Sequence, residues 1–170
     1  MIKTLEVVLD PDGLYTGQEV VPGAQIFVPQ TTDMYGRVWG VYTPAATPPN
    51  TISVNPGDTV RFSIRFKYLG PAVSYTLYCS MGDQTLGIFN EDPKLTKSFS
   101  KSQAAAPSQV TVNLTADIPI PTSYTNYGWR DAYCKVVSPQ TLSPIYIDCI
   151  NIVAYSPTFT DMQITQFAKV

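Results

Sequence analysis

Few residues of this chain could carry out covalent or metal chemistry. The only thiols belong to Cys79, Cys134 and Cys149, and each of them lies inside an apolar, strand-like run. Thiols in such surroundings usually behave as small buried hydrophobic groups. An odd number of cysteines excludes a complete set of disulfides within one chain, so at most one internal bridge can form. We expect free thiols and keep a Cys79–Cys134 disulfide as the alternative.

Histidine is absent from the sequence. Without it the chain cannot form a Ser-His-Asp or Cys-His nucleophile system, and it lacks the commonest zinc ligand. The cysteines show no Cys-x-x-Cys spacing, and the sequence contains no glycine-rich phosphate-binding pattern. The sequence therefore predicts no catalytic residues, no cofactor and a protein that is not an enzyme.

Two short acidic clusters have the residue types that bind calcium, namely Asp10-Pro-Asp12-Gly13 and Asn90-Glu91-Asp92. Calcium needs a shell of several oxygen ligands, and neither cluster continues into the spaced carboxylates and distal glutamate of an EF-hand loop. Aspartates in turns commonly accept hydrogen bonds from nearby backbone N–H groups. We therefore predict ordinary turn residues here and no metal site.

The strongest chemical signal is the concentration of aromatic and arginine side chains in residues 35–42 and 124–130. Side chains of this kind are enriched in the cores of protein interfaces and provide flat surfaces for stacking against sugars. They also cap the open ends of β-sandwich cores, so core capping, protein contact and carbohydrate stacking all remain open. The candidate interface residues are Tyr35, Arg37, Trp39, Tyr42, Tyr124, Tyr127, Trp129 and Arg130.

The charge of the chain bears on its partners. Charged residues make up only 14% of the sequence, and the net charge is −2. No broad positive field exists to attract nucleic acid or anionic lipid. No stretch approaches the ~20 apolar residues of a membrane helix, and Glu6 and Asp10 interrupt the apolar run that a secretory signal would need. We expect other protein subunits as partners, carbohydrate as an alternative, and neither nucleic acid nor membrane insertion.

The elements that must position these residues are strands. Gly and Pro interrupt the chain every several residues and leave no helical run, so the pattern predicts an all-β fold. The clearest strand spans residues 59–69, where apolar residues alternate with polar ones, and Arg61, Arg65 and Lys67 share a face that should be solvated. We expect residues 73–79 to pair with this strand, and further strands at residues 85–89, 109–115, 129–137 and 145–154.

These strands predict an immunoglobulin-like or jelly-roll-like antiparallel β-sandwich over residues 49–156. Residues 1–48 are predicted to be an N-terminal extension with strands at 2–9 and 24–28, packed on the core or exchanged with neighbouring copies. The Pro-rich residues 43–50 favour an extended tether over a strand. Residues 157–170 are predicted to add a closing C-terminal strand.

The stretch Ile52-Ser-Val-Asn-Pro-Gly-Asp-Thr-Val-Arg-Phe-Ser-Ile-Arg-Phe-Lys-Tyr-Leu-Gly70 resembles the opening of immunoglobulin-like modules of the CARDB type, which occur in microbial surface proteins. Such modules begin with a Pro-Gly-Asp turn and a long alternating strand. The similarity covers residues 50–155 and implies a sandwich fold with an accessory binding role. Residues 138–144 lack the acidic, Asn-rich closing segment of these modules, and residues 1–48 have no counterpart in them.

Two function classes fit these features. The first is a structural assembly protein, such as a coat or decoration component of a phage or archaeal virion, in which the flanks contact neighbouring subunits. The second is a cell-surface adhesion or carbohydrate-binding accessory module, which the resemblance implies. The expected location is accordingly a virion, the outside of the cell or the cell surface, with no signal peptide visible in this chain.

Overall fold

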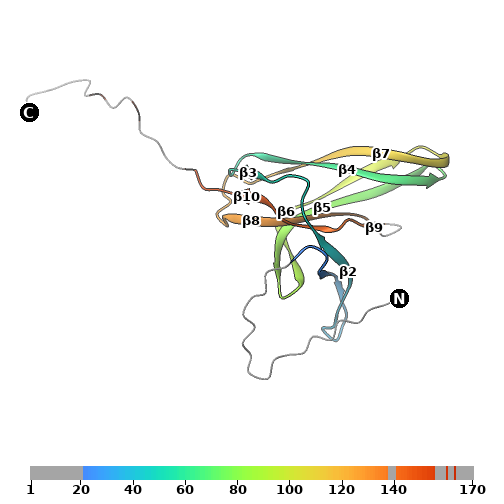
Figure 1. The fold of residues 1–170 in the computed structure, drawn as a ribbon, viewed down its shortest axis with the longest axis horizontal. Helices are drawn as coiled ribbons and strands as arrows, with labels where there is room; N and C mark the ends of the chain where they lie inside the picture. Colours follow the sequence, from blue (N-terminus) through green and yellow to red (C-terminus); the bar gives the residue numbers. More distant parts are fainter. Residues whose placement is uncertain (1–20, 138–140, 156–159, 161–162, 164–170) are drawn as a thin grey trace, which may run out of the picture.

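The computed structural model describes residues 21–137, 141–155, 160 and 163. These residues form strands and no helix, which confirms the all-β prediction (Figure 1). Accordingly, the described part contains no helix able to cross a membrane. The strands are β1 (Gln25–Thr32), β2 (Val38–Ala46), β3 (Ile52–Val54), β4 (Thr59–Gly70), β5 (Val73–Thr85), β6 (Ile88–Gln103), β7 (Ala106–Pro119), β8 (Gly128–Val136), β9 (Thr141–Leu142) and β10 (Ile145–Ile152).

The strands form two sheets stacked as a sandwich. Strands β4 and β7 make a two-stranded sheet that lies over β5, β8 and β10 (Figure 1). The larger sheet has the order β3-β10-β2-β1-β6-β5-β8-β9, and β10 also pairs with β8, which closes six of these strands into a ring. The sandwich is as predicted, but the large sheet is mixed rather than wholly antiparallel. Strand β10 runs parallel to β2 and β3 and antiparallel to β8, and β1 runs parallel to β6.

Each face of the shared strands packs into its own hydrophobic core. Successive side chains of a strand point to opposite faces. On β8, Ala132 therefore packs beneath β4 and β7, whereas Tyr133 points into the ring with Phe89 and Ile145. The sandwich core and the ring core thus share β5, β8 and β10 as a common wall.

The predicted pairing of residues 59–69 with residues 73–79 is wrong. Strand β4 pairs with β7 along its length, and β5 pairs instead with β6 and β8. The connection explains the difference, since Gly70 has a φ of 150° and Pro71 follows it. A tight hairpin needs a positive φ at the first central position, which the ring of Pro71 forbids. The chain therefore crosses from one sheet to the other at this point.

Residues 85–89, predicted to be one strand, contain the turn of the β5–β6 hairpin. Leu86 and Gly87 have φ values of 53° and 74°, and Thr85 pairs with Ile88 on either side of them. Two consecutive positive φ values are characteristic of the type I′ turn, which matches the twist of the flanking strands. Beyond the turn β6 continues through Pro93, because a bulge in the β5–β6 register accommodates it.

The Pro-rich segment 43–50 is not simply a tether, because β2 extends to Ala46 and pairs with β1. The N–H of Ala45 donates to the carbonyl of Ala24. Neighbouring backbone groups of a strand point to opposite sides, so the nitrogen of Pro44 points away from β1 and costs no hydrogen bond there. The predicted strand at residues 2–9 lies outside the described residues, as does most of the predicted strand at residues 157–170.

The three cysteines are free, so the Cys79–Cys134 disulfide is not formed. These two residues nevertheless face each other across β5 and β8. The N–H of Cys134 donates to Ser143 Oγ and its carbonyl accepts from Ser143 N, so its backbone points away from β5. Burial raises the pKa of the Cys79 thiol to about 12, which keeps it protonated at neutral pH.

Candidate functional site

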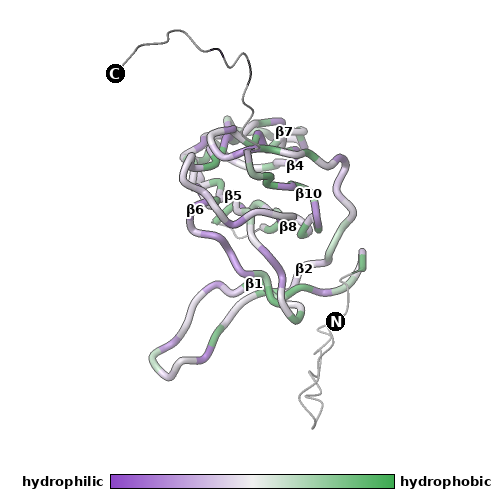
Figure 2. The backbone as a smooth tube through the Cα atoms, turned by 90° about the vertical axis from the view of Figure 1, so that its left-hand side faces the viewer, coloured by the Kyte–Doolittle hydropathy of each residue, from purple (hydrophilic) through white to green (hydrophobic). Residues whose placement is uncertain are grey.

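The first group of predicted interface residues lies at the end of the β1–β2 hairpin, which projects away from the two stacked layers (Figure 2). A register shift between Pro29 and Thr31 bends this hairpin. Gly40 makes the close approach of its strands possible, since a Cβ built on it would lie 2.2 Å from the carbonyl oxygen of Val28. Both features shape the hairpin that carries the predicted residues.

One carboxylate organises the hairpin end. Asp33 Oδ1 accepts hydrogen bonds from the backbone N–H groups of Tyr35 and Arg37, both at 2.9 Å. Its other oxygen accepts from Arg37 Nε at 2.7 Å and from Trp39 Nε1 at 3.3 Å. Gly36 supplies the positive φ of 78° that the turn requires. The backbone hydrogen bond from Arg37 is the main reason that the pKa of Asp33 lies below its ordinary value.

The resulting arrangement is called here the hairpin tip cluster, and it consists of Asp33, Tyr35, Arg37 and Trp39. The Arg37 guanidinium carbon lies 5.3 Å from the Tyr35 ring centroid and 5.7 Å from the Trp39 ring centroid. The Tyr35 residue is 76% exposed and Trp39 is 57% exposed. An arginine held against two exposed aromatic rings has the composition of an interface hot spot.

Further apolar side chains extend the surface around the hairpin tip cluster. Met34, Val38 and Tyr42 are all exposed. The ring of Tyr42 packs against Phe27, with the ring centroids 5.2 Å apart, and this contact connects the surface to the base of the hairpin. Of the predicted interface residues, the structure therefore brings Tyr35, Arg37 and Trp39 together and places Tyr42 farther along the hairpin.

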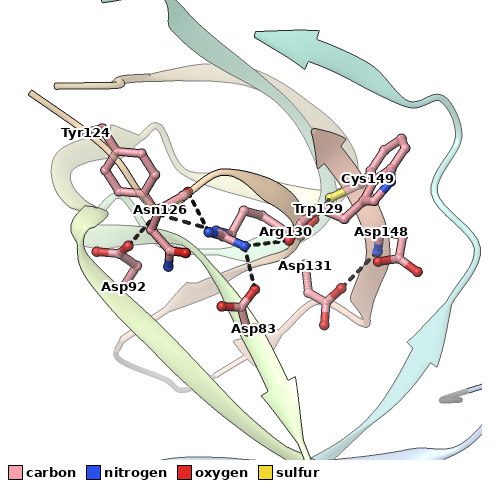
Figure 3. Close-up of polar contacts among 9 residues, drawn as sticks. All are labelled: Asp83, Asp92, Tyr124, Asn126, Trp129, Arg130, Asp131, Asp148 and Cys149. Atoms are coloured by element: carbon pink, nitrogen blue, oxygen red, sulfur yellow. Dashed lines mark hydrogen bonds and ion pairs between the residues drawn. The ribbon is translucent and has the colours of Figure 1, made fainter. Parts of the chain in front are cut away.

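The second group of predicted interface residues is divided between the interior and the surface. Tyr124 is 3% exposed and Arg130 is 4% exposed, whereas Tyr127 and Trp129 are about half exposed. Figure 3 shows Arg130 turned inward, where its guanidinium donates to the carbonyls of Asn126 and Trp129. Tyr124 and Arg130 therefore hold the loop before β8 in place and offer no surface to a partner.

The contacts of Arg130 define a small polar network. Its guanidinium forms an ion pair with Asp83 at 2.9 Å. Tyr124 Oη accepts a hydrogen bond from Arg130 Nε and donates one to Asp92 Oδ2 at 2.6 Å. Asp92, which the sequence suggested as a turn residue, thus anchors the loop through a tyrosine (Figure 3). Among the described residues, no recorded contact joins this network to the hairpin tip cluster.

Comparison with known proteins does not extend this description. No protein-family model, curated protein or solved structure matches the chain. The resemblance of residues 50–155 to CARDB-type modules thus remains a prediction from the sequence. Any functional conclusion has to rest on the geometry of the described residues.

Several described carboxylates have structural partners. No group of three or more metal-ligating side chains occurs within residues 21–137 and 141–155. Glu91 accepts hydrogen bonds from the hydroxyls of Tyr78 and Tyr133, and Asp117 pairs with Arg61 at 2.8 Å. The sequence did not suggest the Glu91 contact, which ties together Tyr78 and Tyr133 of the ring core.

Asp131 is the one described carboxylate whose pKa is strongly raised, to about 6 from an ordinary 3.8. Burial is the main cause, since the residue is only 6% exposed. Its Oδ1 accepts the backbone N–H of Asp148 at 2.8 Å, and Asp148 has a positive φ of 49° inside a register irregularity of β10 (Figure 3). The buried carboxylate therefore caps this irregularity, and the contact assigns it a structural role.

The raised pKa of Asp131 predicts a pH dependence of stability. Between pH 3.8 and pH 6 the folded protein retains a proton that the unfolded chain loses, so this residue lowers stability as the pH rises. The loss should reach up to about 3 kcal/mol above pH 6. In Asp131→Asn the amide oxygen can still accept from Asp148, so its stability relative to wild type should increase from pH 4 to pH 7. Urea unfolding across this range tests this, and parallel pH profiles would contradict it.

Proposed function

We propose that this chain is a non-enzymatic structural protein that assembles with other protein subunits, as a coat or decoration component of a virion or another extracellular or surface particle. The observation that carries the proposal is the hairpin tip cluster. Asp33 fixes Arg37 and Trp39 in place before any partner binds, so less conformational freedom is lost on association. A rigid, exposed Arg-aromatic cluster on a projecting hairpin is typical of residues that dominate the free energy of protein binding.

The geometry favours protein contact over carbohydrate stacking. A sugar ring stacks on an open aromatic face, whereas Arg37 lies over the rings of both Tyr35 and Trp39. Arginine in such a position is suited to pair with a carboxylate or backbone carbonyl of a partner protein. A carbohydrate-binding accessory module is therefore the second candidate, supported by the exposure of Trp39.

The proposed function predicts a strong effect of Trp39→Ala on assembly. Hot-spot truncations weaken binding by about thirtyfold or more, so the variant should shift the concentration dependence of the oligomer mass by at least that factor. Light scattering after size-exclusion chromatography, over a range of protein concentrations, gives the measurement. Tyr155→Ala is the matched control, because Tyr155 is exposed to a similar extent but lies far from the hairpin in sequence.

Two results would count against the proposed function. A wild-type chain that stays monomeric at the highest attainable concentration has no assembly to disrupt. Equal losses in Trp39→Ala and Tyr155→Ala would show that the hairpin tip cluster has no special part in assembly. Glycan-array binding that disappears in Trp39→Ala, with no change in oligomer mass, would instead support the carbohydrate-binding alternative.

A further inference from the structure

Strand β4 has a hydrogen-bonded neighbour on one side only. It pairs with β7, and the two strands make up their sheet. The N–H of Ile120 donates to the carbonyl of Asp58, which points the backbone of Asp58 toward the β7 side. Because these directions alternate along an antiparallel strand, the backbone N–H and C=O groups of Arg61, Ser63, Arg65 and Lys67 point to the other side. No recorded hydrogen bond within the described residues satisfies them.

A groove runs along this open edge. Two adjoining cavities of about 300 and 440 Å³ are bordered by consecutive β4 residues from Val60 to Leu69. Both cavities include Ile64 on β4, and Cys134 and Tyr146 on the opposite wall. The groove therefore occupies the position that a third strand of the small sheet would take, above β8 and β10. Pro48, Pro49 and Asn50 border it beside Val60–Arg65, and the half beside Ile64–Leu69 is free of that segment.

The sandwich core is incomplete along the same edge. The inward side chains of β4 alternate as expected, but only Val60 is fully buried, and Phe62, Ile64, Phe66 and Tyr68 all remain partly exposed. On β7, Val110 is exposed and Ala116 and Ile118 are buried, so exposure on both strands increases toward the end of the sheet where Tyr68 pairs with Val110. A strand edge with unpaired backbone N–H and C=O groups, next to partly exposed apolar side chains, can pair with an added β-strand.

The sequence of this chain contains a segment with the complementary pattern. In residues 4–10, Leu5, Val7 and Leu9 alternate with Glu6, Val8 and Asp10. A strand of this length extends about 23 Å and fits alongside β4. With its three odd-numbered apolar side chains in the groove, it would turn Glu6 and Asp10 toward the outer face of the small sheet.

Charge distinguishes this segment from the other end of the chain. The outer face of β4 carries Arg65 and Lys67, and neither has an ion pair among the described residues, whereas Arg61 is paired with Asp117. With Glu6 opposite Lys67 in an antiparallel pairing, Asp10 would lie opposite Ser63 and diagonally next to Arg65. The C-terminal residues 162–170 contain Lys169 and no acidic residue, so they would add positive charge to positive charge.

We propose that the open edge of β4 receives residues 4–10 of a second copy of this chain as an added third strand. This inference rests on the proposed assembly function and names the partner and a second contact surface. The described chain enters β1 on the far side of β8 and β10 from the β4–β7 layer (Figure 2). If the added strand comes from a second copy, residues 4–10 do not have to pass from the β1 side of β8 and β10 to the β4–β7 side of the same chain. Each copy then binds the next one head to tail.

The test compares two aspartate substitutions in the full chain. Val7→Asp places a charge on the face that enters the groove, and Val8→Asp places the same charge on the outer face. Burying an unpaired carboxylate strongly opposes binding, so Val7→Asp should weaken self-association on the order of a hundredfold. Val8→Asp should leave it within a few-fold of wild type. Sedimentation velocity over a concentration series measures both, and equal effects would overturn the inference.

A mixing experiment identifies the source of the strand. Arg65→Pro removes an N–H that points into the groove and keeps the β4–β7 hydrogen bonds, so this variant should donate but not accept. The Val7→Asp variant should accept but not donate. Each alone should self-associate more weakly than wild type, and an equimolar mixture should recover association through this edge. If circular dichroism shows that Arg65→Pro is unfolded, Ser63→Pro replaces it on the same principle.

The outcomes separate this inference from the proposed function. A mixture that associates no better than either variant alone overturns exchange between copies. Wild-type assembly that survives Val7→Asp but fails in Trp39→Ala overturns the inference and leaves the proposed function in place. A monomeric wild type overturns both.

Discussion

Replacing Arg130 with alanine should lower the free energy of unfolding by about 4 kcal/mol. The side chain is buried, and it donates to the carbonyls of Asn126 at 2.6 Å and Trp129 at 2.7 Å. Removing it leaves those acceptors without a partner, loses the ion pair with Asp83 and opens a cavity where the aliphatic stem was. The loop before β8 should then loosen, because its other anchor is the hydrogen bond from Tyr124 to Asp92.

Asp83→Asn provides the matched control for this prediction. Asp83 is half exposed, so its ion pair with Arg130 is screened by solvent, and its loss should cost less than about 1 kcal/mol. Urea unfolding followed by tryptophan fluorescence measures both variants, since Trp129 precedes Arg130. If the two substitutions cost the same, the ion pair and not the backbone contacts carries the stability of this network, contrary to the expectation.

The second large effect is expected from Gly82→Ala. A Cβ on Gly82 would lie 2.1 Å from the backbone oxygen of Asn90 and 3.0 Å from its carbonyl carbon. Those atoms belong to the paired strand β6 and cannot rotate away as a side chain could. The strands would have to separate at the bulge, so we expect a loss of more than about 3 kcal/mol or a failure to fold.

Gly87→Ala serves as the comparison for Gly82→Ala. A Cβ there meets nothing closer than 3.8 Å, and only its positive φ of 74° opposes alanine, at a cost of about 1 kcal/mol. Thermal unfolding by circular dichroism should therefore rank Gly82→Ala well below Gly87→Ala and wild type. The reverse order would mean that backbone conformation, and not the contact with β6, limits this hairpin.

The sequence predicts the strands of this fold better than their pairing. The alternation in residues 59–69 is a local property, and the structure confirms it from Thr59 onward. Which strand lies beside it depends on the Gly70-Pro71 connection and on the apolar face of the distant β7, and neither is encoded in the alternation. Likewise, Pro44 looked incompatible with a strand because the sequence does not show toward which side its nitrogen points.

The candidate site illustrates the same limit. Residue composition identified Tyr35, Arg37 and Trp39, but Asp33, which holds them together, went unnoticed. The spacing from Asp33 to Gly36 is a turn signal that could have indicated its role. Tyr124 and Arg130 have the same residue types as the exposed cluster, yet they are buried. Composition alone does not distinguish an arginine that faces a partner from one that fixes a loop.

The two outer edges of the small sheet are not equivalent. On β7, Pro119 pairs with Thr59 and has no N–H to offer on the outside, and the outward carbonyl of Thr115 accepts a hydrogen bond from Lys101 Nζ. Among the described residues, the β4 edge has no second strand partner, and Pro48, Pro49 and Asn50 border only its Val60–Arg65 half. An assembly formed through that edge would have polarity, with an empty groove at one terminus and an unused strand at the other. Growth could then be halted selectively at either terminus by a single capping molecule.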